Sequence, residues 1–122
     1  MDLVLQQKCC AQIIMLIGLE ARQSKNVELV QAMKGLCYGL HSQYDCGALS
    51  GGACLLALFN ETYAPLTNKE LVTWFKGKYG SVRCEDIIGQ GYKMSDKCLK
   101  IISETCEQCF EILQRNNLLE EE

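Results

Sequence analysis

The chain has 122 residues, nine of them cysteine and one proline, and a net charge of −3. This length suits one compact domain over residues 1–122, and the apolar share of 48% is enough for a hydrophobic core. The acidic balance and the lack of a block of lysine or arginine argue against binding to nucleic acid or to an anionic membrane surface.

The N-terminal apolar stretch bears on the cellular compartment. It runs from Cys9 to Leu19, is interrupted by Gln12, and is too short for a transmembrane helix and poor as a signal peptide. We therefore expect a cytoplasmic protein. Because thiols stay reduced in the cytoplasm, we expect no permanent disulfide framework, which leaves metal binding, redox cycling or burial as roles for the cysteines.

The first two predicted elements are helices. Apolar residues recur at spacings of three and four over residues 3–21, which predicts a helix with one buried face that ends near Gln23. Asn26 is a suitable N-cap for a second helix, which the apolar pattern extends to Leu40.

The third predicted element is a glycine-rich helix over residues 46–59, with Asp45 as its N-cap. Glycines at positions 47, 51 and 52 would be unfavourable in an exposed helix, but they permit close backbone contact in a buried one. We therefore expect this helix to lie at the centre of the fold, and we expect Gly51 to lie where two helices nearly touch.

Two more elements follow. Thr67 and Glu70 form a capping box that predicts the start of a fourth helix, and Gly80 suits its left-handed C-terminal position. A short turn is expected over residues 83–88.

The last predicted element is a long helix over residues 96–119, with Ser95 as its N-cap. No run of residues alternates with the period of two that is typical of strands. The sequence therefore predicts an all-α fold, a compact bundle of about five helices around the glycine-rich one.

Three cysteines have surroundings that favour a thiolate. Cys46 falls in the first turn of the third predicted helix, where the helix dipole should lower the thiol pKa. Cys84 begins the short turn beside Arg83, and Cys98 lies between two lysines in the first turn of the last helix. Helix N-termini that converge on one point are how an all-α protein could assemble a thiolate site.

Several segments resemble a known family. CCAQIIML, DCGALSGGACLLAL, WFKGKYGSVRCEDIIG and KCLKIISETCEQCFEIL together resemble the redox-active family named for its pattern C-GCAxxG-C-C, although this chain has Cys-Gly-Ala where the pattern has Gly-Cys-Ala. The resemblance covers most of the chain and implies a redox or metal-linked role. It places the pattern's cysteines on Cys10, Cys46, Cys84 and Cys98. These four are the candidate catalytic residues and metal ligands, and Gly47 and Gly51 are the candidate cofactor-binding positions.

The other cysteines carry less information. Cys106 and Cys109 lie one turn apart on an apolar face of the last helix, which suits two metal ligands but is poor geometry for a disulfide. Without a second C-x-x-C the pattern of a zinc site is incomplete. Of the adjacent pair Cys9 and Cys10, only one can point fully inward from a helix, and Cys10 matches the apolar stripe better. Packing in a core or an interface is expected for Cys9, Cys37 and Cys54.

Two classes of function fit these observations. In the first, a cytoplasmic redox-active protein uses the four clustered cysteines as a dithiol/disulfide couple, or as ligands of an iron–sulfur cluster or another soft metal, and acts on a redox protein partner. In the second, a non-catalytic helical interaction protein uses its cysteines to pack a core or a homodimer seam. The sequence does not decide whether the protein is an enzyme.

Overall fold

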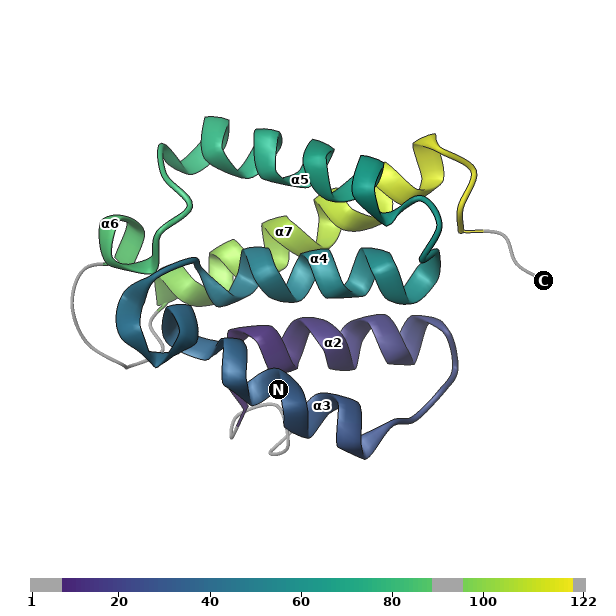
Figure 1. Ribbon diagram of the computed structural model, residues 1–122, viewed down its shortest axis with the longest axis horizontal. Coiled ribbons are helices and arrows are strands. Elements are labelled where there is room, and N and C mark those ends of the chain that lie inside the picture. Colours follow the sequence, from purple (N-terminus) through teal and green to yellow (C-terminus); the bar gives the residue numbers. More distant parts are fainter. Residues whose placement is uncertain (1–7, 89–95, 120–122) are drawn as a thin grey trace.

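The structure, a computed structural model, describes residues 8–88 and 96–119, and within these ranges it contains six α-helices and no β-strand. The predicted all-α class is therefore confirmed (Figure 1). The helices are α2 (Cys10–Ala21), α3 (Val27–Met33), α4 (Gly47–Phe59), α5 (Ala64–Tyr79), α6 (Cys84–Ile88) and α7 (Asp96–Arg115). Two short non-α turns, Lys34–Leu36 and Gly39–Gln43, lie between α3 and α4.

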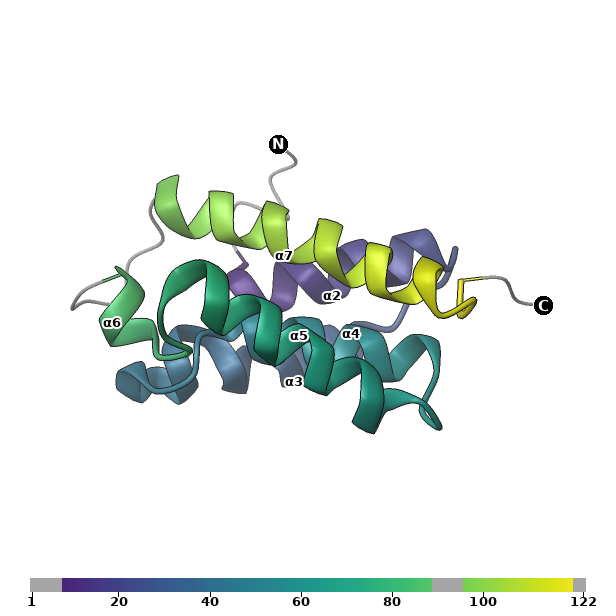
Figure 2. The ribbon, with the colours of Figure 1, turned by 90° about the horizontal axis from the view of Figure 1, so that it is seen from above.

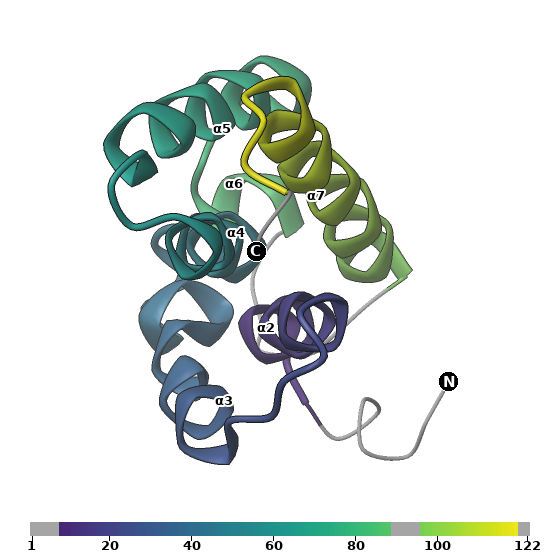
Figure 3. The same ribbon diagram turned by 90° about the vertical axis from the view of Figure 1, so that its right-hand side faces the viewer.

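The glycine-rich helix α4 lies at the centre, as predicted. It packs against α2, α5 and α7. In the view along the bundle, α5 lies above it, α7 to its right and α2 below it (Figure 3). Helices α2, α4 and α7 all begin at the same end of the bundle, and the short α6 lies at that end too (Figures 1 and 2). The N-termini of four helices are thereby brought to one end of the molecule.

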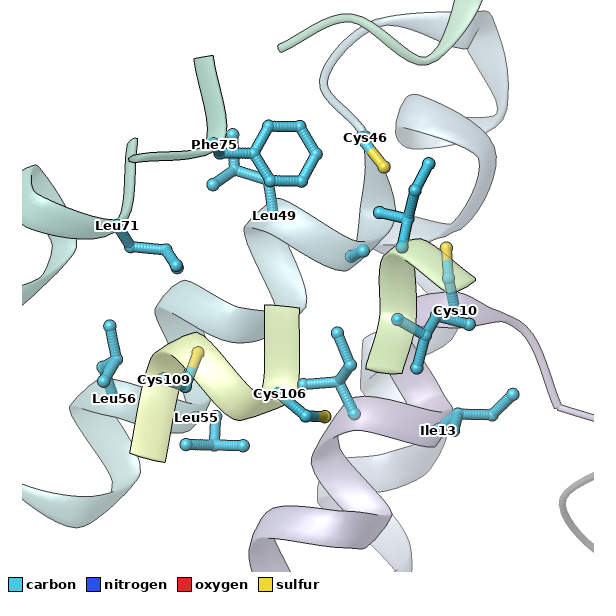
Figure 4. Packing of buried hydrophobic residues seen from close by; sticks show 14 of the residues in the cluster. Cys10, Ile13, Cys46, Leu49, Leu55, Leu56, Leu71, Phe75, Cys106 and Cys109 are labelled. Atoms are coloured by element: carbon cyan, nitrogen blue, oxygen red, sulfur yellow. The ribbon is translucent and has the colours of Figure 1, made fainter. Parts of the chain in front are cut away.

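Close contact between α2 and α4 depends on glycine. A Cβ atom at Gly51 would lie 2.9 Å from the Cα of Ala11, which confirms the prediction that this glycine lies where two helices nearly touch. The main core then forms from side chains of α2, α4, α5 and α7 (Figure 4). A second cluster between α2 and α3 includes Met15, Val30 and Met33.

The first two helices differ from their predicted bounds. Helix α2 begins at Cys10, because Cys9 is extended and acts as the N-cap, and residues 3–7 of the predicted helix lie outside the described residues. Asn26 caps α3 as predicted, since its side chain accepts a hydrogen bond from the N–H of Leu29 at 3.0 Å. Helix α3 ends at Met33 and does not reach Leu40, where the backbone is left-handed.

The predicted N-cap of α4 is wrong. Helix α4 begins at Gly47, so Cys46 itself is the N-cap and no side chain caps the helix. Asp45 lies instead in an isolated antiparallel bridge with Arg83. The backbone of residue 45 is thus held by a partner distant in sequence.

The predicted capping box of α5 is also wrong. Helix α5 begins upstream at Ala64, with Pro65 in its first turn, where a missing N–H costs little. Thr67 is buried inside the helix and donates its hydroxyl hydrogen to carbonyls of the preceding turn. Glu70 accepts a hydrogen bond from Arg115 of α7 at 3.0 Å.

The remaining ends agree better with the sequence. Gly80 is left-handed after α5, with φ of 83°, as predicted. The short turn over residues 83–88 is the helix α6. Helix α7 ends at Arg115, earlier than predicted, because the chain turns at Asn117, whose φ is 59°. The predicted cap Ser95 lies outside the described residues.

Candidate functional site

The structure brings together the four cysteines of the family pattern. Cys10 begins α2, Cys46 caps α4, Cys84 begins α6, and Cys98 lies in the first turn of α7. All four line one cavity of about 20 Å³ at the end of the bundle where these helices begin. In Figure 4, Cys10 and Cys46 lie near each other at one end of the core.

A short backbone pairing fixes Cys46 beside Cys84. The N–H of Cys46 donates to the carbonyl of Val82 at 2.8 Å, and the N–H of Cys84 donates to the carbonyl of Tyr44. The guanidinium of Arg83 lies over the ring of Tyr44, 5.3 Å from its centroid, and pairs with Glu85 at 3.4 Å. Arg83 therefore has partners other than the neighbouring thiol.

The two candidate glycines lie at different places. Gly47 lines the cavity, and a Cβ atom there would collide with the sulfur of Cys10 and lie 3.0 Å from the carbonyl oxygen of Leu36. Gly47 thus allows the thiol of α2 to approach the start of α4. Gly51, one turn later, packs against the backbone of Ala11 and does not line the cavity. A cofactor-binding role for either glycine stays a prediction.

Burial dominates the electrostatics of these thiols. It raises the pKa of Cys46 to about 12, although the backbone N–H groups of Ala48 and Leu49 act in the opposite direction. The pKa values of Cys10 and Cys84 are also raised, mainly by burial and further by neighbouring thiols of the cluster. The expectation of lowered thiol pKa values at Cys46 and Cys84 is therefore wrong, because desolvation outweighs the helix N-terminus.

Tyr38 is a cavity residue that the sequence did not reveal. Its side chain lines the same cavity, and its pKa is raised by burial and then by Cys10, Cys98 and Cys84. Its backbone is left-handed, with φ of 55°. The apolar pattern placed this residue inside a continuous helix, so no sequence signal pointed to the cavity.

Cys9 and Cys37 form a disulfide, which corrects the expectation that these two cysteines serve only for packing in a core or an interface. Their Cα atoms are 6.0 Å apart, and both side chains are buried. The sequence-based prediction placed both Cys9 and Cys10 in the helix, so that only one of them could point inward. Cys9 instead precedes the helix and can turn toward α3. The disulfide ties the start of α2 to the segment that carries Tyr38.

Cys106 and Cys109 lie on the buried face of α7 (Figure 4). Ile102 and Leu113 are buried on the same helix, as predicted. The thiol of Cys109 donates to the carbonyl of Gly52 at 3.7 Å. Burial raises the pKa of Cys106 to about 11 and raises that of Cys109 as well. Both thiols are therefore buried: Cys109 is fully enclosed in the core, and Cys106, 7% exposed, lies at its edge. Cys54 is half-buried on α4, against the cluster between α2 and α3.

The size of the cavity limits which metal centre it could hold. A space of about 20 Å³ holds one water-sized atom, so an iron–sulfur cluster with its several iron and sulfur atoms does not fit the present arrangement. Over residues 8–88 and 96–119, no three or more His, Cys, Asp or Glu side chains are grouped so that they could hold a metal ion. Metal ligation by the four cysteines stays a prediction.

Comparison with known proteins gives one match. A family model described as "Putative redox-active protein (C_GCAxxG_C_C)" matches residues 8–112, a span that contains all four cavity cysteines. No curated protein and no solved structure matches the chain. Among the described helices, none combines the length and the hydropathy needed to cross a membrane.

Proposed function

The chain belongs to the C_GCAxxG_C_C family of redox-active proteins, and we propose that its function is thiol–disulfide exchange at the cavity lined by Cys10, Cys46, Cys84 and Cys98. The observation that carries the proposal is that four cysteines far apart in the sequence face one small cavity. Packing alone would not require four thiols from four different helix starts to meet at one point.

The solvent exposure of the four cysteines suggests which one reacts first. Cys98 is half-buried, whereas Cys10, Cys46 and Cys84 are buried, so Cys98 is the thiol that meets the redox partner. The charge of Cys98 raises the pKa of both Cys84 and Cys10. Either thiol could therefore resolve the mixed disulfide, and Cys84 takes this role in the proposed steps.

The exchange is a two-electron reaction. The thiolate of Cys98, having lost its proton to solvent, attacks a disulfide of the partner, forms a mixed disulfide and releases one partner thiolate. The thiolate of Cys84, also deprotonated by solvent, attacks the Cys98 sulfur and releases the second partner thiolate. The protein then holds a disulfide, and the partner disulfide is reduced to two thiols once its thiolates take up two protons. The reverse sequence reduces the protein.

The buried cluster makes this reaction selective. A thiol with a raised pKa is mostly protonated at neutral pH and therefore attacks disulfides slowly. Random oxidation of Cys10 and Cys46 by small oxidants is thus suppressed, while Cys98 remains accessible to a partner.

Substitution of Cys98 tests the proposal. Reduced protein is exposed to oxidised glutathione, quenched with acid, alkylated and mapped by peptide mass. Wild-type protein should form a disulfide among the four cavity cysteines, and Cys98→Ser should form it much more slowly. Cys54→Ser is the matched control, because Cys54 is also half-buried but lies outside the cavity. Oxidation of Cys98→Ser at the rate and with the products of the control would contradict the assignment.

A further inference from the structure

A second surface feature lies apart from the thiol cavity. A groove of about 770 Å³ runs between α2 and α7, and none of its lining residues lines the cavity of the four cysteines. Ile13 and Ile17 of α2 form one wall, and Leu99, Ile102 and Phe110 of α7 lie along the other. The groove is therefore an apolar surface that the proposed redox chemistry does not use.

The α7 side of this groove has heptad spacing. Leu99, Ser103, Cys106 and Phe110 follow one another at intervals of four, three and four residues, which is the d–a–d–a spacing of a coiled-coil seam. Leu99 is 39% exposed, and the small residues at the middle of the seam would allow another helix to approach closely. The spacing favours a straight helix as the occupant of the groove.

The charges beside the seam are self-complementary. Lys100 and Glu107 occupy equivalent e positions, and Glu111 lies on the same side one turn further along; all three are exposed. The basic charge therefore stands toward the start of α7, and the acidic charges stand toward its end. A second α7 running in the opposite direction presents acidic charge to the basic part and basic charge to the acidic part.

The register follows from the helical rise. If a two-fold axis lies midway between Glu104 and Thr105, Leu99 opposes Phe110 of a second copy. Lys100 then lies between the levels of Glu107 and Glu111 of that copy, about 3 Å along the axis from each at a rise of about 1.5 Å per residue. A parallel pair would place like charges at the same level and gain no such attraction. The charge pattern thus selects an antiparallel second copy of this chain.

We propose that the protein forms a homodimer through the α2–α7 groove, with the two α7 helices antiparallel. Each groove receives the α7 helix of the other copy, so the contact is isologous. The two thiol cavities then lie toward opposite ends of the paired helices, because each cavity is at the start of its own α7.

A charge exchange tests this interface. Sedimentation velocity should show a dimer for wild-type protein. Lys100→Glu should weaken dimerisation by at least about tenfold, because attraction turns to repulsion at two symmetry-related places. Glu107→Lys combined with Glu111→Lys should do the same, and adding Lys100→Glu to that pair, which reverses all three charges, should restore the dimer. Lys76→Glu on α5 makes the same charge change at an exposed residue away from the groove and should leave the dimer unchanged.

Circular dichroism verifies that each variant is folded. A wild-type protein that stays monomeric at about 100 μM, a concentration at which a dimer of micromolar affinity is nearly complete, would overturn the proposal. The occupant of the groove would then have to be residues 1–7 of the same chain or a different protein. A variant with all three charges reversed that dimerises no better than Lys100→Glu alone would overturn the antiparallel register.

Discussion

Replacement of Gly51 by alanine tests how closely α2 and α4 must approach. The added Cβ would lie 2.9 Å from the Cα and 3.2 Å from the carbonyl oxygen of Ala11, both backbone atoms of α2. Favourable carbon contacts are about 3.5–4.0 Å, so the two helices must separate by roughly 0.6–1 Å. We expect this overpacking to lower the free energy of unfolding by about 1–3 kcal/mol. Alanine's higher helix propensity offsets about 1 kcal/mol of that loss.

Gly77→Ala is the matched control, because nothing lies within 4 Å of its added Cβ and the residue is exposed on α5. This variant should gain stability by about 0.5–1 kcal/mol through helix propensity alone. The difference between the two variants, about 1–3 kcal/mol, therefore isolates the contact of α4 with α2. Urea denaturation followed by circular dichroism measures it. If Gly51→Ala stabilises the protein as much as Gly77→Ala does, α2 and α4 are not in this contact.

Three further predictions concern the cysteines. The pKa values of Cys46, about 12, and Cys106, about 11, lie above the ordinary value of 9.0. The free energy of unfolding should therefore be constant below pH 9. As the pH rises from 9 toward those pKa values, it should fall by about 1.4 kcal/mol per pH unit for each thiol. Unfolding free energies between about pH 8 and 11, a window that spans this rise, should show this, and a flat profile would refute it. Iodoacetamide should label Cys98 in native protein much faster than Cys46, because Cys98 is half-buried and Cys46 is only 5% exposed. Peptide mass identifies the labelled cysteine, and equal labelling rates would contradict the burial of Cys46. Replacing Cys9 and Cys37 by alanine removes a cross-link over a sequence separation of 28 and should lower the unfolding free energy by about 3–4 kcal/mol. An unchanged guanidinium midpoint would contradict that expectation.

The sequence predicted those helix ends that depend only on residues within one turn. Asn26 caps α3 and Gly80 ends α5, because a side-chain acceptor and a left-handed glycine act within one turn of chain. The predicted N-cap at Asp45 was wrong because the backbone of residues 44–46 pairs with that of residues 82–84. These two segments are distant in sequence, so no local signal reveals the contact. The predicted cap at Thr67 was wrong because the helix begins three residues earlier, at Ala64, and Thr67 is buried inside it.

The candidate site shows the same division. The positions of Cys46, Cys84 and Cys98 at helix starts followed from the sequence, and the family pattern added Cys10. The direction of the pKa shifts of Cys46 and Cys84 did not follow, because it depends on how deeply the whole bundle buries each sulfur. Tyr38 was also missed, because its place in the cavity depends on a left-handed turn that the apolar pattern does not encode.

Redox titration with disulfide mapping tests the central claim most directly. Protein is equilibrated in thiol–disulfide buffers of graded potential, quenched with acid and alkylated, and its disulfides are identified by peptide mass. A reversible two-electron transition should appear, with the new disulfide joining Cys98 to Cys84 or to another cysteine of the cavity. Reversible oxidation confined to Cys9 and Cys37, with the four cavity cysteines remaining thiols at every potential, would contradict the account.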